Sequence, residues 1–197
     1  MRLKHVFSVV ATAISATFLS ACGEPTTSRA MLTELAPVDW ADAASSFTGP
    51  SGEEMGAAIF TNGPEGVLIR VDLQGLSEGW HAMHLHQVGD CSDGAAGFKA
   101  SKSHVNPDDN AHGLLNPEGN ERADIPNIYA GPDGRATAEI YRVGLSLYPS
   151  EAGTAQNGPF PLLDDDGFAV IVHENPDDHL TQPIGGAGAR VACAAFG

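Results

Sequence analysis

The central part of the sequence reads Gly79-Trp80-His81-Ala82-Met83-His84-Leu85-His86-Gln87. Side chains of a β-strand alternate between two faces, so Met83 and Leu85 are expected to face a packed core. His84 and His86 then share the opposite face, where two imidazoles fixed on one strand make half of a metal site. His81 falls on the core face, and we interpret it as a hydrogen-bonded structural residue.

The sequence around this segment predicts an all-β domain. Apolar and polar residues alternate cleanly over 67–73, and Gly-rich turns occupy 62–66 and 132–134. No long amphipathic helix is visible. Strands are expected at 55–61, 67–73, 79–87, 127–130, 136–143, 168–173 and 190–195. Many short strands joined by such turns favour a sandwich or a barrel.

Two long loops, 89–124 and 174–188, interrupt this pattern and are expected to be functional. Candidate metal ligands lie in these loops, in the central strand and at the end of the strand that precedes the second loop. They are His84, His86, His104, His112, Asp124 and His173. Five histidines supply more nitrogen than one tetrahedral zinc needs. Two neighbouring metals, or one metal and a relay, fit the set, and imidazoles suit copper and zinc rather than calcium or magnesium.

The first 21 residues are predicted to be a targeting segment. Arg2 and Lys4 precede an apolar run over 6–19, which is short for a membrane span and typical of a secretory signal. The ending Leu19-Ser20-Ala21-Cys22 resembles a bacterial lipoprotein signal, in which Cys22 becomes the lipid-carrying N-terminus. An ordinary signal peptide cut nearby is the alternative. Residues 22–37 are expected to be a flexible tether and 38–197 the folded domain.

Such a protein would lie in the cell envelope, on the periplasmic side. Gly23 follows the cysteine where an aspartate would retain a lipoprotein at the inner membrane, so we expect an outer-membrane anchor. Loss of Arg2 and Lys4 with the signal takes the formal net charge from −15 to −17. Phosphates would be repelled, which argues against a nucleic-acid partner.

The chain has three cysteines, an odd number for an exported protein. If Cys22 carries lipid, Cys91 and Cys193 remain as a pair that an oxidising compartment would join. Two free buried thiols are the alternative.

The motifs of the domain resemble those of bacterial copper/zinc superoxide dismutases. The similarity extends over about 47–196. It is carried by His84-Leu85-His86, Ser103-His104-Val105-Asn106-Pro107, His112-Gly113-Leu114, Asp124-Ile125-Pro126-Asn127 and Thr181-Gln182-Pro183-Ile184-Gly185-Gly186-Ala187-Gly188-Ala189-Arg190-Val191-Ala192-Cys193. This resemblance implies a flattened eight-stranded Greek-key barrel with two long functional loops.

The resemblance also implies a role for each matching residue. The copper ligands would be His84, His86, His104 and His173. The zinc ligands would include His104, as the bridge between the metals, with His112 and Asp124. Asp177 matches the carboxylate that links ligands of the two metals, and Arg190 matches the active-site arginine. Cys91 and Cys193 match the family's disulfide. One copper and one zinc per subunit are expected.

One position departs from the family pattern. A further zinc-side histidine is usual three residues before the aspartate, and here that position is Glu121. Glu121 could serve as an oxygen ligand, which zinc accepts. Alternatively, zinc binding is weakened and Glu121 is a solvated loop residue. Because His112, Asp124 and Asp177 are retained, we favour a zinc site with altered ligation.

The implied reaction is the dismutation of superoxide to oxygen and hydrogen peroxide by alternating Cu(II) and Cu(I). His104 would leave copper and take up a proton during the cycle, and Arg190 would attract the anion against the net negative charge. A copper-binding or copper-buffering lipoprotein on the same fold is the alternative function. The expected partners are superoxide and, through the lipid, a membrane, and both a monomer and a homodimer remain open. His179 and 164–166 are interpreted as surface positions, and Trp80 as a packing residue.

Overall fold

The computed structural model describes residues 42–149 and 158–197. The predicted signal segment and the whole of the predicted tether, which includes Cys22, lie outside the described residues. Within them the chain forms β1 (Ala43–Thr48), β2 (Glu54–Asn62), β3 (Gly66–Leu73), β4 (Gly79–His81), β5 (Met83–His86), the 3-10 helices η1 (Gly94–Ala96) and η2 (Lys99–Ser101), β6 (Ile128–Ala130), β7 (Ala136–Val143), β8 (Leu145–Ser146), β9 (Phe160–Pro161), β10 (Phe168–His173) and β11 (Arg190–Phe196).

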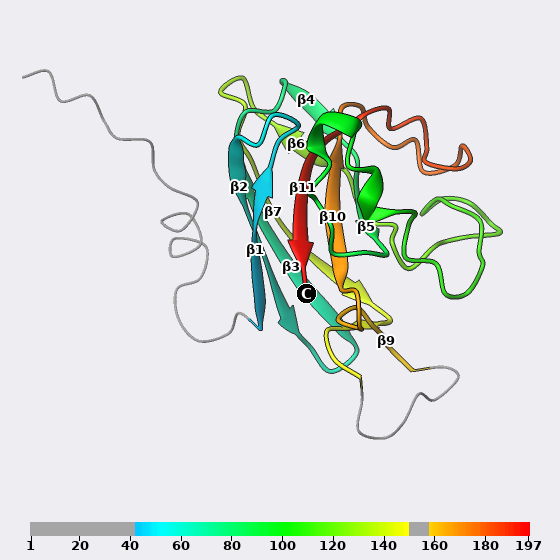
Figure 1. The fold of residues 1–197 in the computed structure, drawn as a ribbon. Coiled ribbons are helices and arrows are strands. Elements are labelled where there is room, and N and C mark those ends of the chain that lie inside the picture. Colours follow the sequence, from blue (N-terminus) through cyan, green and yellow to red (C-terminus); the bar gives the residue numbers. More distant parts are fainter. Residues whose placement is uncertain (1–41, 150–157) are drawn as a thin grey trace, which may run out of the picture.

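Seven strands form one sheet in the order β5-β10-β11-β1-β2-β3-β7. Every pairing in it is antiparallel, and three of its neighbouring pairs, β5 with β10, β11 with β1 and β3 with β7, are far apart in sequence. The sheet curls, and the two long loops extend from the side where β5 and β10 lie (Figure 1). With β6 added, and with β4 and β5 counted as one strand, the molecule has the all-β Greek-key architecture that the sequence predicted.

The predicted strand over 79–87 is interrupted at Ala82. Its first part, β4, pairs with β6, and its second part, β5, pairs with β10. Ala82 lies between the two pairings: its N–H donates to Asn175 O at 2.9 Å, and its carbonyl accepts from His173 N at 2.9 Å. The chain therefore changes its pairing partner within the histidine segment, and the start of the second long loop is bonded to it there.

The core confirms the alternation expected of β5. Met83 and Leu85 belong to the main hydrophobic cluster, whereas His84 and His86 are buried on the other side under the loops. Three phenylalanines fill one end of this core, with the Phe168 and Phe196 rings stacked at 4.7 Å and Phe60 edge-on to both at 5.0 Å.

Three other expectations need comment. His81 is buried, with Nδ1 2.7 Å from His173 O and Nε2 2.9 Å from Ser77 O, which confirms its structural role. Trp80 is 56% exposed and its ring lies edge-on to Tyr129, so it is not a core residue. Strand β1 was not predicted, because Ala-Ala-Ser-Ser-Phe-Thr has no apolar alternation to mark it.

Among the described residues, neither helix has the length and apolar character needed to cross a membrane.

Candidate metal centre

The centre lies between β5, the end of β10 and the first long loop. Register places Ile171 opposite His84 and Ala169 opposite His86, and isolated bridges join His86 to His104 and His84 to Asp124. The His84 ring lies 4.4 Å from the His104 ring and 5.1 Å from the His173 ring, between centroids. The His86 ring lies 5.1 Å from the His104 ring. Strand pairing thus gathers four imidazoles from three parts of the sequence that are far apart.

Each of these four rings uses one nitrogen to bond the protein. His84 Nε2 lies 3.0 Å from Asp177 Oδ2, and His86 Nδ1 lies 2.9 Å from Lys102 O. His104 Nδ1 lies 2.5 Å from Glu121 Oε2, and His173 Nδ1 lies 3.2 Å from Gly188 O. These bonds fix the ring orientations, as partners of metal-ligating histidines do.

The other nitrogen of each ring is buried without a hydrogen-bond partner among the described residues. These atoms are His84 Nδ1, His86 Nε2, His104 Nε2 and His173 Nε2. Ligand atoms of His84, His104 and His173 lie within 4.8 Å of one another, and the His86 ring lies beside them, 5.1 Å from the His104 ring between centroids. A buried lone pair without a partner is costly, so an all-imidazole set of this kind fits a copper ion.

A second group of ligand atoms lies on the far side of His104. His104, His112, Glu121 and Asp124 are all buried or nearly so and offer atoms within 4.8 Å of one another. His112 Nδ1 is 2.7 Å from Asp124 Oδ1 and 3.3 Å from Glu121 Oε2. Asp124 Oδ1 is buried without a hydrogen-bond partner among the described residues despite that short contact. The lone pairs of His112 Nδ1 and Asp124 Oδ1 therefore face the same position. Two nitrogens and two oxygens fit a tetrahedral zinc ion.

Asp124 itself is held by the backbone. Its other oxygen, Oδ2, accepts the N–H groups of Gly113 at 2.8 Å and Glu121 at 2.9 Å. The loop that provides the ligands therefore also fixes which carboxylate oxygen is available to a cation.

Asp177 connects the two groups. Its Oδ2 bonds His84 Nε2 at 3.0 Å and its Oδ1 bonds His112 Nε2 at 3.1 Å. Both nitrogens are the ones turned away from the ligand positions, so this carboxylate orients one ring of each group rather than forming a third metal site. The structure therefore places Asp177 between one ring of each group.

Burial keeps three of the copper-side rings neutral. It lowers the pKa of His173 to about 3, holds the pKa of His86 well below its usual range, and lowers the pKa of His84. Neutral imidazole is the form that ligates a metal. At neutral pH the metal therefore meets no competing proton on these three rings.

The zinc-side group has the opposite electrostatics. Burial opposes charge on His112, but its contacts with Asp124, Asp177 and Glu121 raise its pKa to about 11. Burial likewise opposes charge on Glu121, but His104 and His112 lower its pKa to about 2. A cluster of carboxylates that attracts a proton so strongly is also one that attracts a cation.

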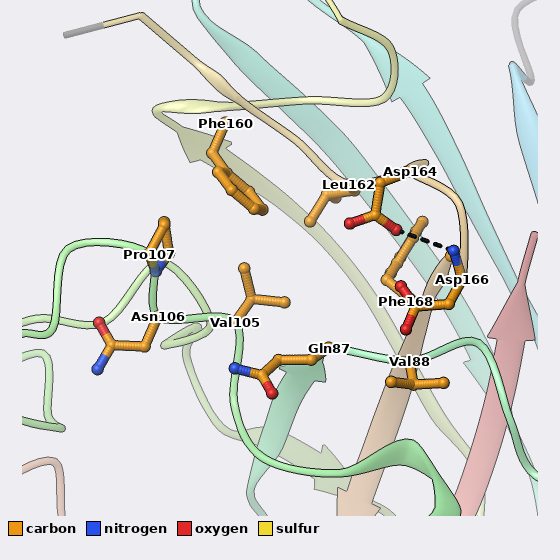
Figure 2. A pocket seen from close by; sticks show the side chains of 11 residues that line it. Gln87, Val88, Val105, Asn106, Pro107, Phe160, Leu162, Asp164, Asp166 and Phe168 are labelled. Atoms are coloured by element: carbon orange, nitrogen blue, oxygen red, sulfur yellow. Dashed lines mark hydrogen bonds between the residues drawn. The ribbon is translucent and has the colours of Figure 1, made fainter. Parts of the chain in front are cut away.

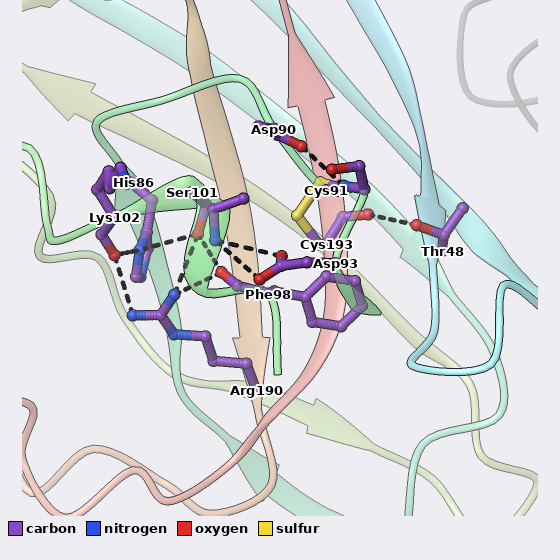
Figure 3. The surroundings of a disulfide bond; sticks show 12 residues. Thr48, His86, Asp90, Cys91, Asp93, Phe98, Ser101, Lys102, Arg190 and Cys193 are labelled. Carbon is purple, nitrogen blue, oxygen red and sulfur yellow. Dashed lines mark hydrogen bonds between the residues drawn. A yellow bond between two sulfur atoms is a disulfide. The ribbon is translucent and has the colours of Figure 1, made fainter. Parts of the chain in front are cut away.

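Arg190 lies beside the copper-side rings at the start of β11. Nη1 donates to Phe98 O at 2.6 Å and to Ser101 Oγ at 3.2 Å, and Nη2 donates to Lys102 O at 3.0 Å. Lys102 O also accepts from His86 Nδ1. The Arg190 guanidinium is thus bonded to the 98–102 segment, whose Lys102 carbonyl also orients the His86 ring (Figure 3).

The same segment is attached to the sheet by a disulfide between Cys91 and Cys193, whose Cα atoms are 5.8 Å apart. This confirms the pairing expected from the sequence and excludes the alternative of two free thiols. Phe98 packs against Cys193 and the neighbouring residues of β10, next to the carbonyl that Arg190 bonds (Figure 3).

The sequence did not indicate several residues that support the centre. Asn127 Nδ2 donates to Asp177 O at 2.8 Å, and Asp177 N donates to Asn127 Oδ1 at 2.9 Å. His179, predicted to be a surface residue, has a side chain only 19% exposed, and its N–H donates to Asp177 Oδ1 at 2.7 Å. That prediction was wrong, because the polar loop around it folds over the centre. By contrast, 164–166 are exposed, as expected.

Comparisons with known proteins agree with this geometry. The family model described as copper/zinc superoxide dismutase (SODC) matches residues 54–196. A Superoxide dismutase [Cu-Zn] of Caulobacter vibrioides is 51% identical over 143 residues, which cover 72% of this chain and 78% of that protein. A Superoxide dismutase [Cu-Zn] 2 of Aquifex aeolicus is 36% identical over 143 residues, with the same coverage. The crystal structure of a SOD-like protein from Bacillus subtilis has a TM-score of 0.69 at 28% identity, covering 77% of this chain and 96% of that one.

Proposed function

The chain belongs to the copper/zinc superoxide dismutase family, and on that basis we propose a role for each residue of its centre. The activity is the conversion of superoxide to oxygen and hydrogen peroxide, with copper and zinc as cofactors. Copper would be held by His84, His86, His104 and His173. The observation that supports this assignment is the set of four buried ring nitrogens without hydrogen-bond partners, each on a ring whose other nitrogen is bonded.

Copper would supply the electron exchange with superoxide, and zinc would be held by His104, His112, Asp124 and Glu121. Within the chain, His104 Nε2 is the atom at which we propose a proton is taken up and then given to the reduced oxygen species. Arg190 carries a permanent positive charge beside the copper-side rings, and we assign it the attraction and docking of the anion. Its role is required because the chain as a whole repels anions.

We assign Glu121 as an oxygen ligand of zinc in place of the usual histidine. Oε2 lies within reach of both His104 Nδ1 and His112 Nδ1, and the side chain is 12% exposed. A solvated loop residue would have neither feature. The copper-buffering alternative has no observation that favours it over catalysis, since the copper-side rings and Arg190 are all in position.

The test is metal content measured together with superoxide-dismuting activity, in the native domain and in Glu121→His. Copper and zinc near one each, with high activity, would support the assignment. Copper without zinc in the native domain, with activity restored only by Glu121→His, would overturn the zinc assignment and favour a copper-binding protein.

We further propose that Cys22 carries lipid and anchors the domain to the periplasmic face of the outer membrane through residues 22–37. The support is the Leu19-Ser20-Ala21-Cys22 box followed by Gly23. Cys22→Ala should release the protein from the membrane fraction, and mass spectrometry of the N-terminal peptide should find the acyl groups on the native chain. An unmodified N-terminus would leave the ordinary signal peptide as the correct interpretation.

A further inference from the structure

Glu121 has two carboxylate oxygens, and they have different surroundings. Oε2 faces His104 Nδ1 at 2.5 Å and His112 Nδ1 at 3.3 Å. Oε1 instead accepts a hydrogen bond from Asn106 Nδ2 at 3.0 Å. The carboxylate is therefore held so that only one oxygen is directed at the ligand group.

The orientation of the Asn106 amide follows from its own contacts. Asn106 Oδ1 accepts the backbone N–H of Asn110 at 3.1 Å, and Nδ2 donates to Asn110 O at 2.9 Å. A backbone N–H can only donate and a carbonyl can only accept, so the NH2 group must be the one that faces Glu121. Figure 2 shows the Asn106 amide turned away from Phe160 and Leu162, which line the neighbouring cavity.

The backbone at Glu121 is fixed independently. Arg142 of β7 donates from Nη2 to Glu121 O at 2.8 Å and to Asn120 Oδ1 at 2.6 Å, and from Nε to Arg122 O at 3.2 Å. Arg142 thus holds the main chain, and Asn106 holds the end of the side chain. The glutamate is secured at two points, as a ligand with several rotatable bonds needs to be.

We propose that Asn106 is a positioning residue that restricts Glu121 to one-oxygen ligation and so keeps the zinc site four-coordinate. This rests on the proposed role of Glu121 as a zinc ligand. A histidine offers a single ligating nitrogen, whereas a glutamate can bind with one oxygen or with two. Because Asn106 occupies Oε1, Glu121 supplies one ligand atom, the same number that a histidine at this position would supply.

The experiment measures zinc and cobalt binding to the copper-free domain. Asn106→Ala and the isosteric Asn106→Asp should each weaken zinc binding by about 10- to 100-fold, the usual effect of losing a partner of a ligand. Four-coordinate Co(II) absorbs visible light more strongly than five- or six-coordinate Co(II), so the same variants should give a weaker cobalt spectrum. Asn110→Ala is the matched control: within the described residues its side chain bonds only the Asn120 carbonyl, and zinc affinity should remain close to native.

Repeating the Asn106 substitutions in a Glu121→His background separates positioning from general damage to the loop. A residue that acts through Glu121 has nothing to position there, so zinc affinity should change by less than about threefold. An equal loss in both backgrounds would overturn the proposal, and so would native affinity in the single Asn106 variants. If Glu121→Ala itself leaves zinc affinity and the cobalt spectrum unchanged, the ligand role of Glu121 is the part that fails.

Discussion

At the scale of single residues, the rings of His84, His86 and His173 each have one nitrogen bonded to the protein and one buried without a hydrogen-bond partner among the described residues. The protein-bonded nitrogen of His173 meets a main-chain carbonyl, whereas that of His84 meets the Asp177 carboxylate. A ring held in this way cannot turn its free nitrogen toward another group. The free nitrogens have lost contact with water without gaining a protein partner, so metal binding satisfies them at little reorganisation.

Replacing Arg190 tests whether its charge acts on the substrate. In Arg190→Ala we expect copper content to be retained and kcat/KM to fall by about tenfold or more, since one docking charge is lost. Stopped-flow decay of superoxide on protein of measured copper content is the appropriate assay. Lys99→Ala removes an exposed positive charge from the segment that Arg190 bonds and should have a clearly smaller effect. An unchanged rate in Arg190→Ala would rule out the docking role.

At the scale of elements, the two long loops support each other as well as the metals. Leu115 N in the first loop donates to His179 O in the second at 3.1 Å. Gly113, next to the ligand His112, makes this approach possible: its φ is +118°, and a Cβ there would lie 2.2 Å from His179 O. Gly185 is similar, because a Cβ would meet Asp177 Oδ1. The glycines of these motifs therefore determine how closely the loops pack.

Gly113→Ala should separate the loops and weaken the zinc side. We expect a loss of about 1–3 kcal/mol in the free energy of unfolding, from strained backbone and the contact with His179 O, together with weaker zinc binding. Gly97→Ala is the matched control in the same loop, since Gly97 also has positive φ (+85°) but a Cβ there would have no atom within 4 Å. Denaturant unfolding and zinc titration would measure both effects. Equal losses in the two variants would show that close packing is unimportant.

The disulfide is expected to stabilise both the fold and the position of Arg190. It closes a segment with a sequence separation of 102, for which chain entropy gives at most about 4.7 kcal/mol. The double variant Cys91→Ser/Cys193→Ser should lose stability toward that limit and lose activity, because the loop carrying Phe98 O is released. Guanidinium unfolding with and without reductant would measure this. Reductant should shift the native protein and leave the variant unchanged; a native curve insensitive to reduction would contradict the prediction.

At the scale of the whole molecule, the histidines give the metal-free protein a stability maximum near pH 6.5. Above that pH, His112 keeps its proton in the folded chain up to a pKa of about 11 while the unfolded chain loses it, so stability falls as pH rises. Below it, His173 stays neutral in the folded chain down to a pKa of about 3 while the unfolded chain takes up a proton, so stability falls as pH falls. Glu121, with a folded pKa of about 2, adds to the loss below about pH 4.5.

Melting temperatures of the metal-free domain between pH 4 and pH 10 would test this profile. His112→Gln should remove the decline on the alkaline side and leave the acid side in place. A melting temperature that does not change between pH 7 and pH 9 in the native domain would contradict the assigned role of His112.

Much of this architecture could be predicted from the sequence, because the patterns that decide it, such as strand alternation, lie within a few consecutive residues. Alternation alone placed Met83 and Leu85 in the core and His84 and His86 opposite them. The break at Ala82 could not be foreseen, since a change of pairing partner depends on Asn175 and His173, which lie far along the chain. The contact between Asn106 and Glu121 could not be predicted either, because it joins two loop residues whose spacing follows no regular period.

The copper-facing and zinc-facing residues also differ in how they can be inherited. His84, His86 and His173 lie on strands whose neighbours include core residues, so replacing one disturbs both the register and the metal. His112, Glu121 and Asp124 lie on one loop, outside every named strand. A substitution there changes the ligand and leaves each strand pairing intact. Substitutions of the strand histidines are therefore constrained by both packing and metal binding, whereas substitutions of the loop ligands are constrained mainly by metal binding. A glutamate at a position where a histidine is usual is the kind of substitution that the loop can accept during evolution.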